Sequence, residues 1–146
     1  MRLALAQGRL ALPDCLPNPP VGCVLVRDNV VISQGYTQAP GLQHAEAMAL
    51  SRFTDCRSGV TAFVTLEPCS FHGRTPSCAL ALINSGVEKV FVGVLDPDPR
   101  NSGTGIRMLQ DAGITVVVGL LSDQAAEDLT DFLVSHCGGS SDRNDQ

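Results

Sequence analysis

Four side chains in the middle of the chain have the types that a zinc site with its own proton carrier requires. His44 and Glu46 stand close together in sequence, and Cys69 and Cys78 follow later. One imidazole and two thiolates can hold Zn²⁺ at three corners and leave the fourth open for water. A carboxylate that stays off the metal can move protons to and from that water. We therefore predict that His44, Cys69 and Cys78 bind zinc and that Glu46 is the general acid/base.

The local sequence around these residues explains how they can meet. Residues 45–51 (AEAMALS) have helix-forming composition, which places His44 and Glu46 in or just before the first turn of a helix. Residues 63–66 (FVTL) are typical of a buried strand, and Pro68 ends it directly before the first cysteine. The second cysteine opens the apolar helical run of residues 78–86. Two helix N-termini directed at one point would favour thiolates over thiols.

Each of these residues also has a purely structural interpretation. A histidine before a helix is often a cap or a core residue, and isolated cysteines are usually small buried apolar residues. Zinc binding is favoured because the residue types fall in the right order, each at an expected helix start or strand end. A structural zinc ion would need a fourth protein ligand, and His72, between the two cysteines, is the candidate for it.

The composition predicts one soluble globular domain that acts on a small molecule. The chain has 146 residues, of which 44% are hydrophobic and 17% charged. Its net charge of −5 argues against nucleic-acid binding, which would require clustered Lys and Arg. One Tyr, five Phe and no Trp also make a stacking platform for single strands improbable.

We expect a cytoplasmic protein without a membrane segment. The N-terminal apolar stretch is broken by Gln7, Gly8 and Arg9, and no cleavage site follows it, so it does not resemble a signal peptide. No apolar run is long enough to span a membrane. In a reducing compartment, metal binding or burial explains cysteines better than disulfides do. The cysteines expected to be structural are Cys15, Cys23, Cys56 and Cys137.

A hairpin followed by alternating strands and helices predicts an α/β fold with a mixed, mostly parallel five-stranded sheet and helices on both faces. The hairpin turn is expected at Asp28-Asn29. The expected strands are residues 21–26, 30–34, 63–66, 89–95 and 114–118; the expected helices are residues 3–11, 45–51, 78–86, 106–112 and one capped by Ser122. Ligands of such sheets bind at the carboxyl ends of strands, where Cys69 falls. Residues 1–137 would form the domain, and residues 138–146 a disordered polar tail.

The segment between the fourth strand and the next helix allows two further functions. Gly103-x-Gly105 before a helix could cradle a phosphate, and Asp96 and Asp98 could bind a hard cation. The glycine pattern lacks the full phosphate-binding fingerprint, and both aspartates stand beside prolines. We therefore interpret this segment as turns.

Four segments, in this order, resemble the riboflavin-biosynthesis pyrimidine deaminases, which are the deaminase half of the bifunctional diaminohydroxyphosphoribosylaminopyrimidine deaminase/reductase. The segments are PNPPVGCVLV (17–26), HAE (44–46), VTLEPCSFHGRTPSC (64–78) and DPDPRNSGTGI (96–106). The resemblance extends from about residue 3 to residue 120. The H-x-E, P-C and C pattern is that of the zinc deaminases, with a longer gap between the cysteines than in nucleoside and tRNA deaminases.

This resemblance implies a cytidine-deaminase-like three-layer α/β/α sandwich. It also implies hydrolytic removal of the exocyclic 2-amino group from 2,5-diamino-6-ribosylamino-4-pyrimidinone 5′-phosphate, with release of ammonia. Asn18 matches the amide that reads the pyrimidine, although it could also be a turn residue between two prolines. Arg74 matches a basic position from which the ribityl or phosphate end can be contacted. Members of this superfamily are commonly oligomers, so we expect a homodimer.

The chain departs from the family pattern at several positions. Thr37 and Phe71 stand where histidine is common, and His72 is a candidate to take the vacated place. The glycine turn is S-G-T-G in place of A-G-R-G, and no dinucleotide-dependent reduction is expected of these residues. The alternatives are a deaminase of another pyrimidine or purine, and a catalytically idle zinc-binding partner domain. The presence of Glu46 argues against an idle site.

Overall fold

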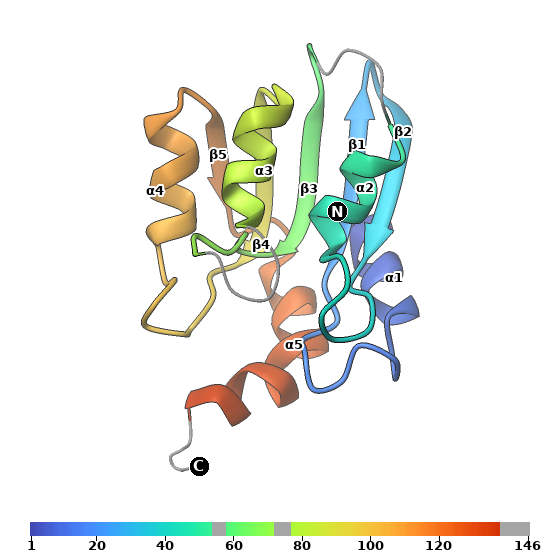
Figure 1. Ribbon diagram of the computed structural model, residues 1–146, viewed down its shortest axis with the longest axis vertical. Coiled ribbons are helices and arrows are strands. Elements are labelled where there is room, and N and C mark those ends of the chain that lie inside the picture. Colours follow the sequence, from blue (N-terminus) through green and yellow to red (C-terminus); the bar gives the residue numbers. More distant parts are fainter. Residues whose placement is uncertain (54–57, 72–76, 138–146) are drawn as a thin grey trace.

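The chain forms a three-layer α/β/α sandwich, as expected (Figure 1). The computed structural model describes residues 1–53, 58–71 and 77–137, with the backbone alone for residues 134–137. The five strands are hydrogen-bonded in the order β2-β1-β3-β4-β5. Within the described residues, no helix is long and apolar enough to cross a membrane.

The elements have bounds within two residues of those expected from the sequence. The strands are β1 (Gly22–Arg27), β2 (Val30–Tyr36), β3 (Thr61–Leu66), β4 (Lys89–Val94) and β5 (Thr115–Val118). The helices are α1 (Arg2–Leu10), α2 (Ala45–Ser51), α3 (Cys78–Ser85), α4 (Thr104–Asp111) and α5 (Ser122–Cys137). Local composition and periodicity were sufficient here because apolar runs and turn residues alternate cleanly along the chain.

Four of the five strands run in the same direction, but only two of the four strand pairings are parallel. Strand β1 runs antiparallel to both of its neighbours, β2 and β3, whereas β3, β4 and β5 are mutually parallel. Because β1 lies inside the sheet, its one reversed direction accounts for two antiparallel pairings. The β1–β2 hairpin turns at Asp28 and Asn29, whose φ angles of 52° and 63° suit the predicted tight turn.

Helices α2, α3 and α4 cover one face of the sheet, and α1 and α5 cover the other (Figure 1). The main core lies between the sheet and the first group and includes Leu25, Val64, Leu82, Val90 and Leu109. Leu129 and Leu133 of α5 form a second cluster with Leu66 at the end of β3. Burial of each such side chain contributes about 1.5–3 kcal/mol. The two layers of helices therefore hold the sheet from both sides and leave its carboxyl edge for a site.

The cysteines outside the motif agree with a structural role where they are described. Cys15 and Cys23 are fully buried and carry free thiols. Cys56 and the side chain of Cys137 lie outside the described residues. Burial raises the pKa of the Cys23 thiol well above its usual range, which keeps it protonated and unreactive.

Gly105 lets helix α4 approach the end of β3 more closely than a larger residue would. A Cβ atom at this position would overlap the backbone carbonyl oxygen of Pro68 and lie 3.3 Å from the Glu67 carboxylate. Because Pro68 precedes Cys69, this contact sets α4 directly against the segment that carries the first motif cysteine.

We predict that Gly105→Ala destabilises the protein despite the higher helix propensity of alanine. Alanine gains about 1 kcal/mol of propensity in a helix interior. Overlap with a backbone atom costs more, because the backbone must shift, and we expect a net loss of about 1–3 kcal/mol. Thermal unfolding measures it, with the exposed Gln110→Ala on the same helix as control. A melting temperature at or above that of the native protein would contradict this packing.

Candidate active site

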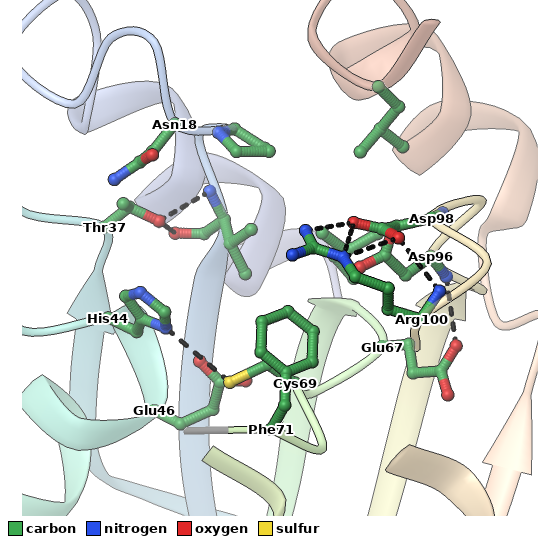
Figure 2. Close-up of a pocket in the computed structure, with 14 residues that line it drawn as sticks. Asn18, Thr37, His44, Glu46, Glu67, Cys69, Phe71, Asp96, Asp98 and Arg100 are labelled. Carbon is green, nitrogen blue, oxygen red and sulfur yellow. Dashed lines mark hydrogen bonds and ion pairs between the residues drawn. The ribbon is translucent and has the colours of Figure 1, made fainter. Parts of the chain in front are cut away.

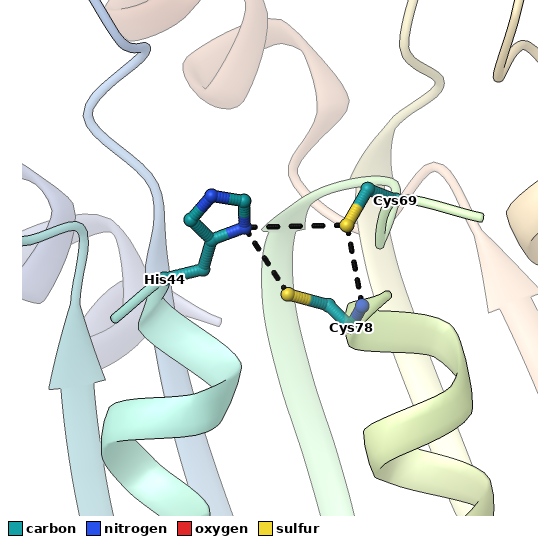
Figure 3. A group of neighbouring side chains, drawn as sticks. All are labelled: His44, Cys69 and Cys78. Carbon is teal, nitrogen blue, oxygen red and sulfur yellow. Dashed lines mark hydrogen bonds between the residues drawn. The ribbon is translucent and has the colours of Figure 1, made fainter. Parts of the chain in front are cut away.

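Three predicted ligand residues from separate segments meet at the carboxyl end of β3. His44 precedes α2, Cys69 follows β3, and Cys78 is the first residue of α3 (Figure 3). Their ligand atoms all lie within 4.8 Å of one another. His44 Nδ1 is 3.2 Å from Cys78 Sγ and 4.0 Å from Cys69 Sγ.

This spacing fits a tetrahedral zinc ion. Zinc–nitrogen bonds of about 2.0–2.1 Å and zinc–sulfur bonds of about 2.3 Å place nitrogen and sulfur about 3.6 Å apart. The two observed distances lie on either side of that value. The His44 backbone is extended, with φ −75° and ψ 169°, and its side chain does not cap α2. His44 is thus the N-cap residue of α2 by position, but its ring does not cap the helix and is directed at the two cysteines.

The start of α3 supplies donors to the first cysteine. The Cys78 N–H donates to Cys69 Sγ at 3.2 Å, and the Ser77 hydroxyl donates to the Cys69 carbonyl oxygen at 2.9 Å. A hydrogen bond from the Cys78 thiol and the nearby His44 lower the pKa of Cys69 to about 4. The same negative sulfur, together with burial, raises the pKa of Cys78 well above its usual range. Without a cation, a negative charge on Cys69 thus opposes a second one on Cys78. A divalent cation would attract both sulfurs as thiolates and offset this repulsion.

Glu46 lies in the first turn of α2 and lines the same cavity as His44 and Cys69 (Figure 2). Its side chain is 4% exposed. Burial and the neighbouring Cys69 sulfur raise the pKa of Glu46 to about 7, while His44 acts in the opposite direction. A bound cation would also favour the charged carboxylate. A carboxyl group so placed can accept and donate protons near neutral pH.

A cavity of about 220 Å³ opens beside these residues (Figure 2). Its size suits a small heterocycle, since pockets for drug-sized ligands start at about 300 Å³. It is lined by Asn18, Pro19, Val21, Thr37, His44, Glu46, Leu66, Glu67, Cys69, Phe71, Asp96, Asp98, Arg100 and Leu133. The lining thus combines apolar walls with two of the three residues of the metal-binding group, which we define as His44, Cys69 and Cys78.

Of the residues predicted to contact substrate, the structure describes only Asn18. Asn18 lines the cavity, and its backbone N–H donates to the Cys15 carbonyl oxygen at 2.8 Å. The turn interpretation and the pocket interpretation of this residue are thus compatible. Arg74 and His72 lie outside the described residues.

Thr37 and Phe71, the two positions expected to depart from the family pattern, both lie on the cavity wall. The Thr37 hydroxyl accepts a hydrogen bond from the Val21 N–H at 3.1 Å and donates one to the Val21 carbonyl oxygen at 3.4 Å. The Thr37 hydroxyl therefore joins the residue after β2 to the residue before β1. Phe71 presents its ring, and the Arg100 guanidinium lies 4.8 Å above it. These departures change the polar character of the pocket without touching the metal-binding group.

Glu67 was not identified as a functional residue from the sequence, where it merely ended a strand. It is 3% exposed, and its carboxylate accepts backbone hydrogen bonds from Asp96 and Gly103 at 3.1 Å and from Ile106 at 3.2 Å. An internal carboxylate thus occupies the N-terminus of α4, where an anion binds favourably. The prediction that the glycine segment is a turn and not a phosphate cradle agrees with this arrangement.

Asn101 is a second residue whose part was not evident from the sequence. It is fully buried, and its side-chain oxygen accepts from the Ser70 N–H at 2.9 Å. Its side-chain nitrogen donates to the Pro68 carbonyl oxygen and to the Asp96 carboxylate, both at 3.3 Å. Asn101 thereby joins the loop after β4 to the segment that carries Cys69. An asparagine among prolines and glycines indicates a turn, but nothing local reveals its distant partners.

Asp96 and Asp98 form turns, as expected, and also line the cavity. The Asp98 N–H donates to the Asp96 carboxylate at 2.9 Å, and the Arg100 N–H donates to the Asp98 carboxylate at 2.9 Å. The Arg100 side chain, which the sequence did not single out, lies beside them on the cavity wall (Figure 2). A turn rich in proline and aspartate after a parallel strand is the signal that could have marked this loop as part of the site.

Comparison with known proteins gives consistent matches over most of the chain. The riboflavin biosynthesis protein RibD of Haemophilus influenzae is 49% identical over 117 residues, which cover 80% of this chain and 32% of that protein. The diaminohydroxyphosphoribosylamino-pyrimidine deaminase of Buchnera aphidicola is 42% identical over 127 residues, covering 87% of this chain and 86% of that protein.

The fold gives the same result. The structure of Acinetobacter baumannii RibD superimposes with a TM-score of 0.87 at 41% identity, covering 92% of this chain and 38% of that one. This chain spans about a third of the length of the RibD proteins that it matches. Residues 1–94 match the family described as the cytidine and deoxycytidylate deaminase zinc-binding region. The chain belongs to this deaminase family.

Proposed function

We propose that this protein is a zinc-dependent hydrolase that removes the exocyclic amino group of a phosphorylated aminopyrimidine. The substrate we propose is 2,5-diamino-6-ribosylamino-4-pyrimidinone 5′-phosphate, an intermediate of riboflavin biosynthesis. The observation that carries the proposal is the meeting of His44, Cys69 and Cys78 beside Glu46 at one cavity. The similarity to riboflavin-pathway deaminases supports the choice of substrate.

His44, Cys69 and Cys78 are the proposed zinc ligands. Zinc, when bound there, supplies a Lewis acid that makes water a better nucleophile. Glu46 accepts the proton of the attacking water and passes it to the ring nitrogen beside the amino-bearing carbon. Glu46 then takes the second proton, from the hydroxyl group newly bonded to that carbon, and delivers it to the amino group. The carbon–nitrogen bond breaks, ammonia leaves, the carbonyl product forms and the carboxylate is regenerated.

The remaining cavity residues position the base. Asn18 offers both a donor and an acceptor, which suits a ring nitrogen next to a carbonyl group. Val21, Leu66 and Leu133 supply apolar wall and limit the entry of water. The roles proposed for Arg74 and His72 at the substrate stay predictions, because both lie outside the described residues.

Two conservative substitutions separate the metal ligands from the proton carrier. Cys78→Ser removes a thiolate, and we expect zinc content to fall well below one per chain and the zinc-dependent rise in melting temperature to disappear. Glu46→Gln keeps the shape of the side chain, and we expect it to retain zinc but to lose turnover by at least about 10²-fold. Elemental analysis, thermal unfolding and ammonia release measure these effects. A near-normal rate in Glu46→Gln would rule out this mechanism.

A comparison of four substrates tests the proposed activity. The zinc-loaded protein is offered the phosphorylated riboflavin precursor, its dephosphorylated form, cytidine and guanine in parallel, with ammonia release as the readout. We expect the highest kcat/KM for the phosphorylated precursor. Much faster turnover of cytidine or guanine would overturn the pathway assignment and leave the deaminase chemistry intact. One zinc per chain with no ammonia from any substrate would favour an idle zinc-binding domain.

We also propose a cytoplasmic homodimer in which residues 1–137 form the deaminase domain. Support for self-association comes from exposed leucines on α1 and the loop that follows it: Leu3, Leu10, Leu12 and Leu16. Exposed apolar side chains concentrated in one segment are typical of an interaction surface. Light scattering at micromolar concentration should report twice the mass of the chain, and a strict monomer would contradict the proposal.

A further inference from the structure

The charges around the cavity leave few places for an anionic group. Four carboxylates line it, from Glu46, Glu67, Asp96 and Asp98. Apart from the proposed metal ligand His44, Arg100 is the one basic side chain among the described residues of the lining. A phosphate monoester carries a charge of about −1.5 to −2 at neutral pH. Such a group would be repelled from most of this wall and attracted to the end where Arg100 lies.

The guanidinium of Arg100 is held along one of its edges. Its Nε donates to the two Asp98 carboxylate oxygens at 3.1 and 3.2 Å, and its Nη2 donates to one of them at 2.6 Å. Each Nη atom of a guanidinium carries a second N–H. Among the residues that the structure describes, none accepts a hydrogen bond from Nη1. The edge formed by Nη1 and Nη2 is therefore available for the bidentate contact that phosphate oxygens make with arginine.

The flat face of the guanidinium is also supported. It lies 4.8 Å above the centre of the Phe71 ring, where a cation is attracted to the aromatic face. An imidazole that became protonated would repel it instead. Phe71 thus suits a neighbouring arginine. Asp98 and Phe71 together restrict the side chain before a ligand arrives, which lowers the entropy lost on binding.

The position of Arg100 matches the far end of a bound substrate. Figure 2 shows the guanidinium lying over Phe71, with its terminal nitrogens toward the side of the pocket that carries Asn18 and Thr37. In the same view, His44 and Cys69 lie below Thr37, and the Phe71 ring lies between Cys69 and the guanidinium. The Arg100 side chain is 72% exposed, so that a charged group can reach it without leaving water completely. A base seated at Glu46 would place its charged substituent at this mouth.

We propose that Arg100, held by Asp98 and Phe71, binds the phosphate end of the substrate and contributes to the preference for phosphorylated over dephosphorylated aminopyrimidines. This inference rests on the proposed deaminase function and adds to it the residue that selects the charged substrate. Asp98 is then a positioning residue, because it orients the guanidinium and does not itself contact the phosphate.

The test measures the ratio of kcat/KM for the phosphorylated precursor to that for its dephosphorylated form. We expect Arg100→Gln to lower this ratio by about 10–100-fold, as expected for loss of hydrogen bonds to a charged group. The ratio for Arg100→Lys should lie between those of the native protein and of Arg100→Gln, because lysine keeps the charge and loses the paired donors. The matched control is Arg107→Gln, an exposed arginine on α4 outside the cavity lining, which should leave the ratio unchanged. An unaltered ratio in Arg100→Gln overturns the inference.

A binding measurement separates this inference from the deaminase proposal. Calorimetric titration with ribose 5-phosphate, on the zinc-loaded protein, should give an affinity that Arg100→Gln lowers at least about 10-fold and Arg107→Gln leaves alone. If no aminopyrimidine is deaminated and this dependence on Arg100 persists, the proposed function fails and the anion site stands. If the phosphorylated precursor is deaminated and ribose 5-phosphate binds equally to all variants, the function stands and the anion site is wrong.

Discussion

The central constraint on this molecule is the burial of two sulfurs and a carboxylate at one point. Glu46 and Cys78 are almost fully buried, and Cys69 lies beside both. Their mutual repulsion and loss of hydration raise the pKa of Glu46 and of Cys78 and would oppose folding with all three charged. Two helix N-termini directed at the site reduce this cost, and a divalent cation removes most of it. Metal affinity and local stability are therefore coupled here.

A second carboxylate makes this arrangement rigid. Glu67 accepts hydrogen bonds from two backbone N–H groups at the start of α4 and from one just after β4. Asn101, in the loop between β4 and α4, joins that loop to the segment that carries Cys69. Gly105 permits the close approach that these hydrogen bonds require. The cavity wall formed by the loop after β4 is consequently linked to the same strand end that holds the metal ligand. One connected group of residues therefore sets the geometry at the mouth of the pocket and at Cys69, a proposed metal ligand.

The sequence alone was sufficient for the elements and for the group of side chains that could hold zinc, because both depend on local signals. Helix and strand bounds follow from periodicity, and His44, Cys69 and Cys78 have types and positions that few other functions need. Glu67 and Asn101 could not be assigned in this way. Apart from the contact between Asn101 and Asp96, their partners lie about thirty or more residues away in the chain. They come into contact only because the segment from the end of β4 to the start of α4 packs against the residues that follow β3. Sequence spacing carries no information about such contacts.

Thr37 and Phe71 lie in the pocket wall but outside the three proposed metal ligands. The Thr37 hydroxyl is hydrogen-bonded to the backbone of Val21, so its position now serves the scaffold more than the ligand. Phe71 has become the support of a guanidinium. Neither change alters the distances among the three proposed metal ligands, which are set by α2, α3 and β3. Substrate selection can therefore diverge at the mouth of this cavity while the reacting end is conserved by the fold that surrounds it.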